Sequence, residues 1–229
     1  MNKAAISGDI IAYTSLSDAD KNNIEAAIKQ LFKDLKDSFD VYGRIIKGDY
    51  IECYIPKPKD ALRITLAIKS CIKSVSPDSN EKNNRRIDVY RTHGIRLAIG
   101  IGEISRLDLN KGIIDGDAIY FSGRLISETN ATSNKERIVI KNTLFIKTVN
   151  EEVDRAMEPL FALLDVLISK ATAKQCSVLY LKLLGNNEEE IAKTLSLAQS
   201  TVNKHSTNLG WNAIDKAVLF FEKVVETKL

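Results

Sequence analysis

The 229-residue sequence predicts an α+β protein in which a ferredoxin-like domain of the split βαβ, palm type precedes an all-α helix-turn-helix domain. Over the first 150 residues, β-prone runs and amphipathic segments alternate in the order β-α-β-β-α-β, then α-β. Beyond residue 150 the pattern is helical, with no convincing strand. We therefore expect a ferredoxin-like domain at 1–150, a connecting helix at 151–168 and a helix-turn-helix domain at 169–229.

The N-terminal elements are predicted from local signals. A strand at 3–13 precedes a helix at 18–37, for which Ser17 and Asp20 form a capping box. Two short strand-like runs flank Lys47-Gly48-Asp49 and predict a hairpin with Gly-Asp at its tip. The later elements are expected to be a helix at 61–75, a polar loop at 76–86, a buried strand at 94–104, a helix at 117–129 and a strand at 137–142.

The C-terminal stretch predicts two short helices joined by a tight turn. One helix ends at Gly185, which suits a left-handed cap, and Asn187 caps the next helix. After the turn "SLAQ", a third helix begins near Gln199 with Val202 pointing inward. This pattern indicates a helix-turn-helix, although the same arrangement also serves as a packing module that does not contact DNA. The residues expected to face DNA are Gln199, Ser200, Thr201, Asn203 and Lys204.

Bulk composition is typical of a globular protein, with 44% apolar and 28% charged residues. No apolar run approaches the roughly 18 residues of a membrane span, so no membrane association is expected. Three cysteines, far apart and odd in number, fit neither a disulfide framework nor a zinc site and suggest a reducing cytoplasm. The net charge of +3 permits nucleic-acid binding without indicating it.

Three aspartates, Asp9, Asp49 and Asp117, each follow a glycine. Asp9 and Asp49 interrupt apolar runs, where a charge is costly unless it is paired, binds a metal or meets water. In a split βαβ sheet the first strand end and the hairpin tip lie side by side, so both carboxylates can bind Mg²⁺ or Mn²⁺. Such metals can clamp a triphosphate. The structural alternative is that these residues form turns, and that Asp117 starts the helix at 117–129.

The palm-like segments "GDIIAYT", "IIKGDYIECY", "RLAIGIGEI" and "GDAIYFSGRL" resemble those of class III nucleotidyl cyclases. The resemblance implies a purine nucleotide ligand, with Asp9 and Asp49 as metal ligands. It also implies Arg124 as a phosphate clamp, and Lys47 lies near the expected nucleotide.

This sequence departs from the cyclase pattern at two positions. Tyr120 stands where cyclases have a transition-state asparagine, and Ile45 stands where they have a base-selecting lysine. Arg44 and Arg96 are equally well explained as surface charges, and the "GIG" glycines at 100–102 as a site where the first helix packs closely.

Two further resemblances concern the C-terminal part and the whole chain. Residues 171–218 resemble the helix-turn-helix of LuxR-type and sigma-factor-like regulators, which implies a DNA partner. The complete layout, from "ISGDI" to "GWNA", is similar to the SatD family.

The first interpretation is a cytoplasmic DNA-binding regulator with a nucleotide-sensing or dimerising palm. We expect a homodimer, because paired half-sites add affinity. The alternatives are a divergent metal-dependent nucleotidyl cyclase or related phosphotransferase, and a protein-binding scaffold.

Overall fold

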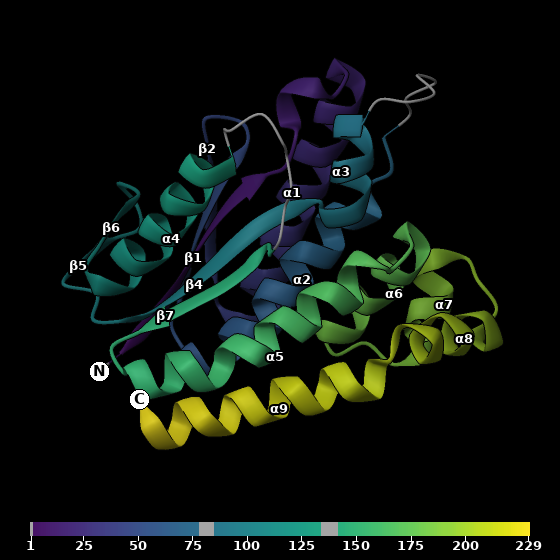
Figure 1. Cartoon of the computed structure of the whole chain (residues 1–229). Helices are drawn as coiled ribbons and strands as arrows, with labels where there is room; N and C mark the ends of the chain where they lie inside the picture. Colours follow the sequence, from purple (N-terminus) through teal and green to yellow (C-terminus); the bar gives the residue numbers. More distant parts are fainter. Residues whose placement is uncertain (1, 78–84, 134–141) are drawn as a thin grey trace.

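The computed structural model describes residues 2–77, 85–133 and 142–229. A five-stranded sheet has the order β2-β3-β1-β4-β7, in which only the β4–β7 pair is parallel (Figure 1). Its strands are β1 (Lys3–Ile10), β2 (Tyr42–Ile46), β3 (Tyr50–Ile55), β4 (Ile95–Gly102) and β7 (Leu144–Thr148). A separate two-stranded hairpin consists of β5 (Arg106–Asp108) and β6 (Ile113–Asp115).

Helices cover both faces of the sheet, and further helices form an outer layer (Figure 1). The helices are α1 (Asp18–Phe39), α2 (Ala61–Ser74), α3 (Arg85–His93), α4 (Asp117–Ser133), α5 (Glu151–Ser169), α6 (Ala173–Leu183), α7 (Glu188–Leu195), α8 (Gln199–Leu209) and α9 (Trp211–Lys228). Helix α4 packs on β1 and β4, whereas α1 and α2 lie on the opposite face. Helix α6 then packs on α2, and α5 packs on β7 and α9.

The two faces of β1 carry different side chains because strand residues alternate in direction. Ile6 and Ile10 are buried on the α1 and α2 face. Ser7 and Asp9 lie on the α4 face, where the Ser7 Oγ is 2.9 Å from the Ser122 Oγ. The polar positions of β1 are therefore placed beneath α4.

Most of the N-terminal predictions are confirmed. The helix predicted at 18–37 is α1, and the Ser17 hydroxyl accepts a hydrogen bond from the Asp20 N–H at 3.1 Å. The hairpin with Gly48-Asp49 at its tip is β2–β3. The helix predicted from Asp117 is α4.

The structure corrects three expectations about the N-terminal part, adds elements that were not predicted and leaves one expectation untested. Helix α3 begins inside the predicted loop at 76–86, and β7 and the β5–β6 hairpin were not predicted. The strand expected at 137–142 falls almost entirely outside the described residues. Gly100 allows α4, and not the first helix, to pack closely on the sheet, because a Cβ at this position would overlap the carbonyl oxygen of Ala118. Arg96 is not a surface charge, since it is buried beside Asp9.

The C-terminal residues from 151 onward are helical, as predicted. Gly185 has a φ of +94° just beyond α6, and Asn187 caps α7 in a capping box with Glu190. A small hydrophobic cluster joins α6, α7 and α8, and its buried members are Val178, Ile191, Ala192 and Val202. The positions of these helices therefore follow from their capping residues and apolar spacing, which are signals carried by residues close together in the sequence.

Candidate functional site

Asp9 and Asp49 lie at the same edge of the sheet, on neighbouring strand ends. Asp9 ends the polar face of β1, and its Cα is opposite Tyr50 of β3. The Ile10 N–H donates a hydrogen bond to the Asp49 carbonyl oxygen at 2.9 Å. This bond ties the end of β1 to the β2–β3 hairpin tip, so the backbones of Asp9 and Asp49 lie side by side, with Asp49 opposite Ile10.

Asp9 already has a cationic neighbour on the next strand. The Arg96 Nη1 lies 3.4 Å from the Asp9 Oδ2, and the Arg96 side chain is only 7% exposed. Burial lowers the pKa of Arg96, and the charge of Asp9 opposes that shift. A cation that binds Asp9 must therefore share its carboxylate with a buried guanidinium.

The hairpin tip carries Asp49 in a tight turn beside Tyr13, which precedes α1. Lys47 and Gly48 both have positive φ angles, 55° and 79°, and the Asp49 N–H donates a hydrogen bond to the Lys47 carbonyl oxygen at 3.0 Å. Burial, the hydrogen bond to Glu25 and nearby carboxylates, including Asp49, raise the pKa of Tyr13 to about 12. Asp49 thus lies in an acidic neighbourhood, which favours a cation as its ligand.

Lys47 and Arg124 are both exposed, but they are placed differently. Lys47 is part of the turn that carries Asp49. Arg124 is on α4, two residues after Ser122, which faces the sheet, so helical geometry puts Arg124 on the outward side. Tyr120, one turn earlier, is 67% exposed on the same side. Asp9 and Arg124 therefore occupy different sides of α4.

The predicted DNA-facing residues lie on the N-terminal half of α8. Gln199, Ser200, Asn203 and Lys204 are exposed, and Thr201 is half-buried. Glu188 of α7 accepts hydrogen bonds from the Gln199 Nε2 at 3.2 Å and the Asn203 Nδ2 at 3.3 Å. The sequence did not predict that an acidic side chain would hold both amides.

A groove of about 670 Å³ lies between α1, α2, α6 and α7. The Tyr180 hydroxyl donates a hydrogen bond of 2.5 Å to the Asp34 carboxylate inside it. Its lining residues include Asp34 and Asp37 but no lysine or arginine. This acidic groove is therefore unsuited to the phosphates of a nucleotide.

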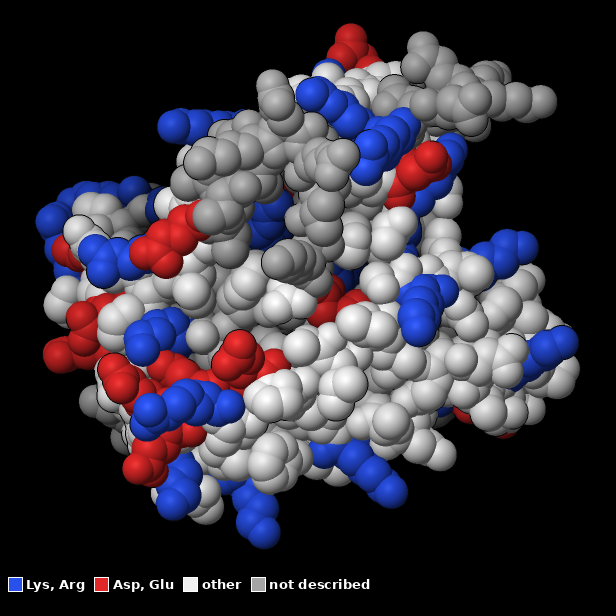
Figure 2. Space-filling view, viewed as in Figure 1, with Lys and Arg blue, Asp and Glu red and all other residues white. Residues whose placement is uncertain are grey.

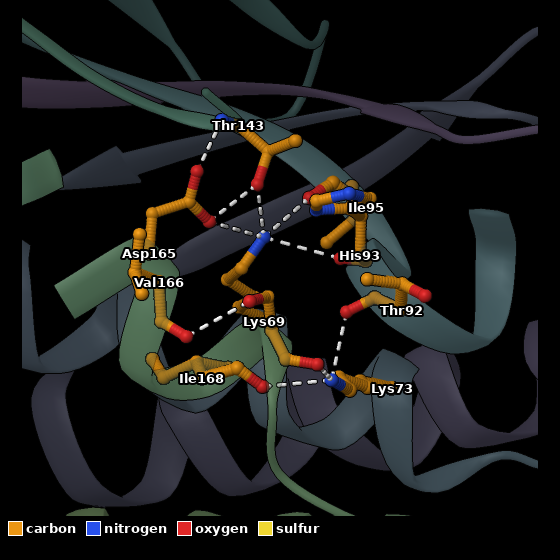
Figure 3. Close-up of polar contacts among 10 residues, drawn as sticks. Lys69, Lys73, Thr92, His93, Ile95, Thr143, Asp165, Val166 and Ile168 are labelled. Atoms are coloured by element: carbon orange, nitrogen blue, oxygen red, sulfur yellow. Dashed lines mark hydrogen bonds and ion pairs between the residues drawn. The ribbon is translucent and has the colours of Figure 1, made fainter. Parts of the chain in front are cut away.

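A buried polar cluster that sequence reasoning missed connects α2 with α5 (Figure 3). The Lys69 Nζ donates to the Thr143 Oγ1 at 2.5 Å and to the His93 and Ile95 carbonyl oxygens, and it lies 3.3 Å from Asp165. Asp165 in turn accepts hydrogen bonds from the Thr143 hydroxyl and N–H. The available signal was a lysine inside the apolar run "LAIKSCI".

Lys73, one turn after Lys69, caps the end of α5. Its ammonium donates to the carbonyl oxygens of Thr92, Ile168 and Ser169 at 2.6–2.7 Å (Figure 3). Burial lowers the pKa of Lys73 to about 8. All its hydrogen-bond donors are used within the fold, so Lys69 and Lys73 join elements rather than form an open site.

The described residues contain no group of three histidine, cysteine or acidic side chains arranged to hold a metal ion. The two carboxylates at the sheet edge would thus need oxygen atoms from a bound phosphate or the backbone to complete a metal's coordination. Among the described helices, none is long and apolar enough to cross a membrane.

Comparisons with known proteins give remote structural likenesses. No family model and no curated protein matches the chain, so the resemblance to the SatD family stays a prediction. Two structures of a bacterial light-regulated adenylyl cyclase align with 64% of this chain at 14% identity, with TM-scores of 0.42 and 0.43. The alignments cover 42% and 43% of those chains, so this chain spans less than half their length. A guanylyl cyclase aligns with 56% of this chain and 70% of its own at 12% identity, with a TM-score of 0.39.

Proposed function

We propose that the chain binds a purine nucleoside triphosphate with Mg²⁺ or Mn²⁺ at the sheet edge that carries Asp9 and Asp49. The hydrogen bond between the Ile10 N–H and the Asp49 carbonyl carries this proposal, because it fixes two carboxylate-bearing strand ends side by side. Carboxylates are the ligands that hard divalent cations prefer. The triphosphate would supply the remaining oxygen ligands, and Lys47 lies in the same turn to meet a phosphate.

The same site supports either nucleotide sensing or a divergent cyclase-like phosphotransfer. For turnover, Arg124 would have to reach the bound phosphates. It projects outward from α4, so a second chain would have to supply it. Tyr120 offers a phenol where cyclases have an amide, which favours binding without efficient cyclisation.

A thermal-shift titration with ATP and GTP, each with Mg²⁺, Mn²⁺ or EDTA, tests nucleotide binding. We expect stabilisation only with metal and nucleotide together, and loss of that stabilisation in Asp49→Asn. Asp37→Asn, an exposed aspartate on α1, is the matched control and should behave as wild type. Equal stabilisation of wild type and Asp49→Asn would refute the site.

A second candidate function, DNA binding through α8, rests on a different observation. The exposed Gln199, Ser200, Asn203 and Lys204 line one end of a helix that follows α7 after a short turn. Their side chains are of the kinds that contact base edges and phosphates. Together with the sheet-edge site, this face favours a regulator in which a nucleotide shifts the population of DNA-binding states.

Fluorescence anisotropy with pooled DNA duplexes over a salt series tests this candidate. Lys204→Ala should weaken binding across all sequences and flatten the salt dependence, as expected for a phosphate contact. Asn203→Ala should instead change sequence preference. Lys29→Ala, an exposed lysine on α1, serves as the control. No salt-dependent binding by wild type would leave α8 as a packing helix.

A further inference from the structure

Helix α5 carries a regular stripe of side chains on the side opposite the core. Its buried positions, such as Met157, Phe161 and Ile168, pack inward. The residue after the helix, Lys170, keeps helical backbone angles, so it extends the outward side by one turn. One row of exposed residues on this outward side, spaced alternately four and three apart, consists of Glu152, Ala156, Pro159, Leu163, Val166 and Lys170. The exposed charged residues Arg155 and Glu158 lie beside this row. This spacing is the one by which two long helices pack along a seam.

The stripe is self-complementary when it is read in the opposite direction. It begins with an acid, Glu152, and ends with a base, Lys170. The positions between them are apolar, with the small Ala156 near the acidic end and the larger Val166 near the basic end. Each residue lies as far before Phe161 as its counterpart lies after it.

We propose that a second copy of this chain docks on the stripe, with the two α5 helices antiparallel and the two-fold axis at the level of Phe161. Glu152 would then meet the partner's Lys170, and Ala156 would meet the partner's Val166. Pro159 would meet the partner's Leu163. Because the axis repeats every contact, two ion pairs flank an apolar centre.

The surrounding surface suits such a contact. Leu163 is 70% exposed and Val166 is 50% exposed. On the adjoining helix α9, Phe220 is 52% exposed, and the rings of Phe161 and Phe221, 6.2 Å apart, fix the level at which α5 and α9 touch. Figure 2 shows an area without charged side chains over the middle of α5, with acidic residues, interleaved with Lys or Arg, gathered toward its N-terminal end. Large side chains exposed together on neighbouring helices mark an interaction surface.

Charge order is the reason for choosing a second copy as the occupant. Any partner must place a base opposite Glu152, apolar side chains opposite the centre and an acid opposite Lys170. An antiparallel copy of the same helix has its side chains in this order. An interface of two helix faces falls at the small end of the size range, so we expect a concentration-dependent dimer. The inference does not depend on the proposed nucleotide or DNA site, since it is tested without either ligand.

Charge reversal tests the pairing of Glu152 with the partner's Lys170. In sedimentation velocity over a concentration series, Glu152→Lys and Lys170→Glu should each weaken the dimer roughly tenfold or more, because attraction becomes repulsion at two places. The double variant should regain wild-type association, and Lys29→Glu is the matched control. Melting temperatures check that each variant folds. A wild type that stays monomeric, or a double variant that stays dissociated, would overturn the proposal.

Introduced cysteines test the register. The three native cysteines are buried, so an added exposed thiol will dominate oxidation. A mixture of Ala156→Cys and Val166→Cys chains should form a disulfide-linked heterodimer, because these positions face each other across the axis. Each variant alone should remain unlinked, since its own two copies lie on opposite sides of the axis. Linkage of each variant with itself, or none in the mixture, would exclude the antiparallel register.

Discussion

Lys69 is a buried cation whose charge is offset by one buried carboxylate, that of Asp165. Burial lowers the pKa of Lys69, while Asp165 opposes that shift. A buried pair of this kind adds little net stability, but removing one partner leaves an uncompensated charge. The pair also joins segments far apart in the chain, so its loss would affect the packing of both α2 and α5.

The first prediction follows from this asymmetry. Lys69→Met should lower the free energy of unfolding by about 3–5 kcal/mol in urea titrations, because Asp165 is left without its cation. Adding Asp165→Asn should recover part of that loss, since the neutral amide oxygen still accepts the Thr143 N–H. If the single and double variants are equally unstable, the charge of Asp165 is not the cause.

For single residues, the sequence showed that a buried charged side chain requires a partner, but it did not show which residue that partner is. It indicated that Asp9 requires a partner, a metal or water, and the structure supplies Arg96 as a neighbour on β4. The two are 87 residues apart, so only the β1–β4 register brings them together. A comparably large separation in sequence hid the contact between Lys69 and Asp165.

Elements were predictable where their signals are local. Asn187 and Gly185 mark helix ends with their own side chain or backbone angle, so α6 and α7 follow from the sequence. Strand β7 was missed because its five residues are mostly half-buried and include Lys147, which pairs with Asp154. Its place depends on parallel pairing with β4, which no local pattern shows.

A second prediction concerns the contact between α4 and β4. Gly100→Ala should destabilise the protein by about 1–3 kcal/mol or more, because the added methyl group overlaps the Ala118 carbonyl and forces α4 away from the sheet. Chemical denaturation measures the loss. Gly185→Ala is an informative contrast, since a Cβ there meets nothing within 4 Å and only the positive φ is strained. A harmless Gly100→Ala would mean that α4 is not held this closely.

A third prediction concerns the pair of helices α7 and α8 and rests on DNA binding by α8. Glu188→Ala should tighten DNA binding roughly threefold or more, because it removes a negative charge and releases Gln199 and Asn203. Glu189→Ala removes a charge one residue away without releasing either amide. Anisotropy titrations at fixed salt compare the two variants. Equal effects would show that charge alone matters.

At the scale of the whole molecule, the predicted boundary near residue 150 crosses a continuous hydrophobic core. One buried cluster runs from Ala4 in β1 to Val225 in α9. Ion pairs reinforce it, since Arg63 contacts Glu222 at 3.0 Å. The Asn2 side chain donates to the Leu229 carbonyl oxygen, and the two chain ends lie close together in Figure 1. Helices α5, α6 and α9 thus share their interior with the sheet.

The fourth prediction is that the two predicted domains unfold as one unit. Trp211, the single tryptophan, reports on α9 by fluorescence, whereas hydrogen exchange of β1 and β4 amides reports on the sheet. Because both parts bury the same core, the two signals should give the same free energy of unfolding in urea. Lys73→Met, which removes the ammonium capping α5, should lower both values equally. A tryptophan transition at lower urea than sheet exchange would instead show that the helical part unfolds by itself, and would support the boundary that the sequence predicts.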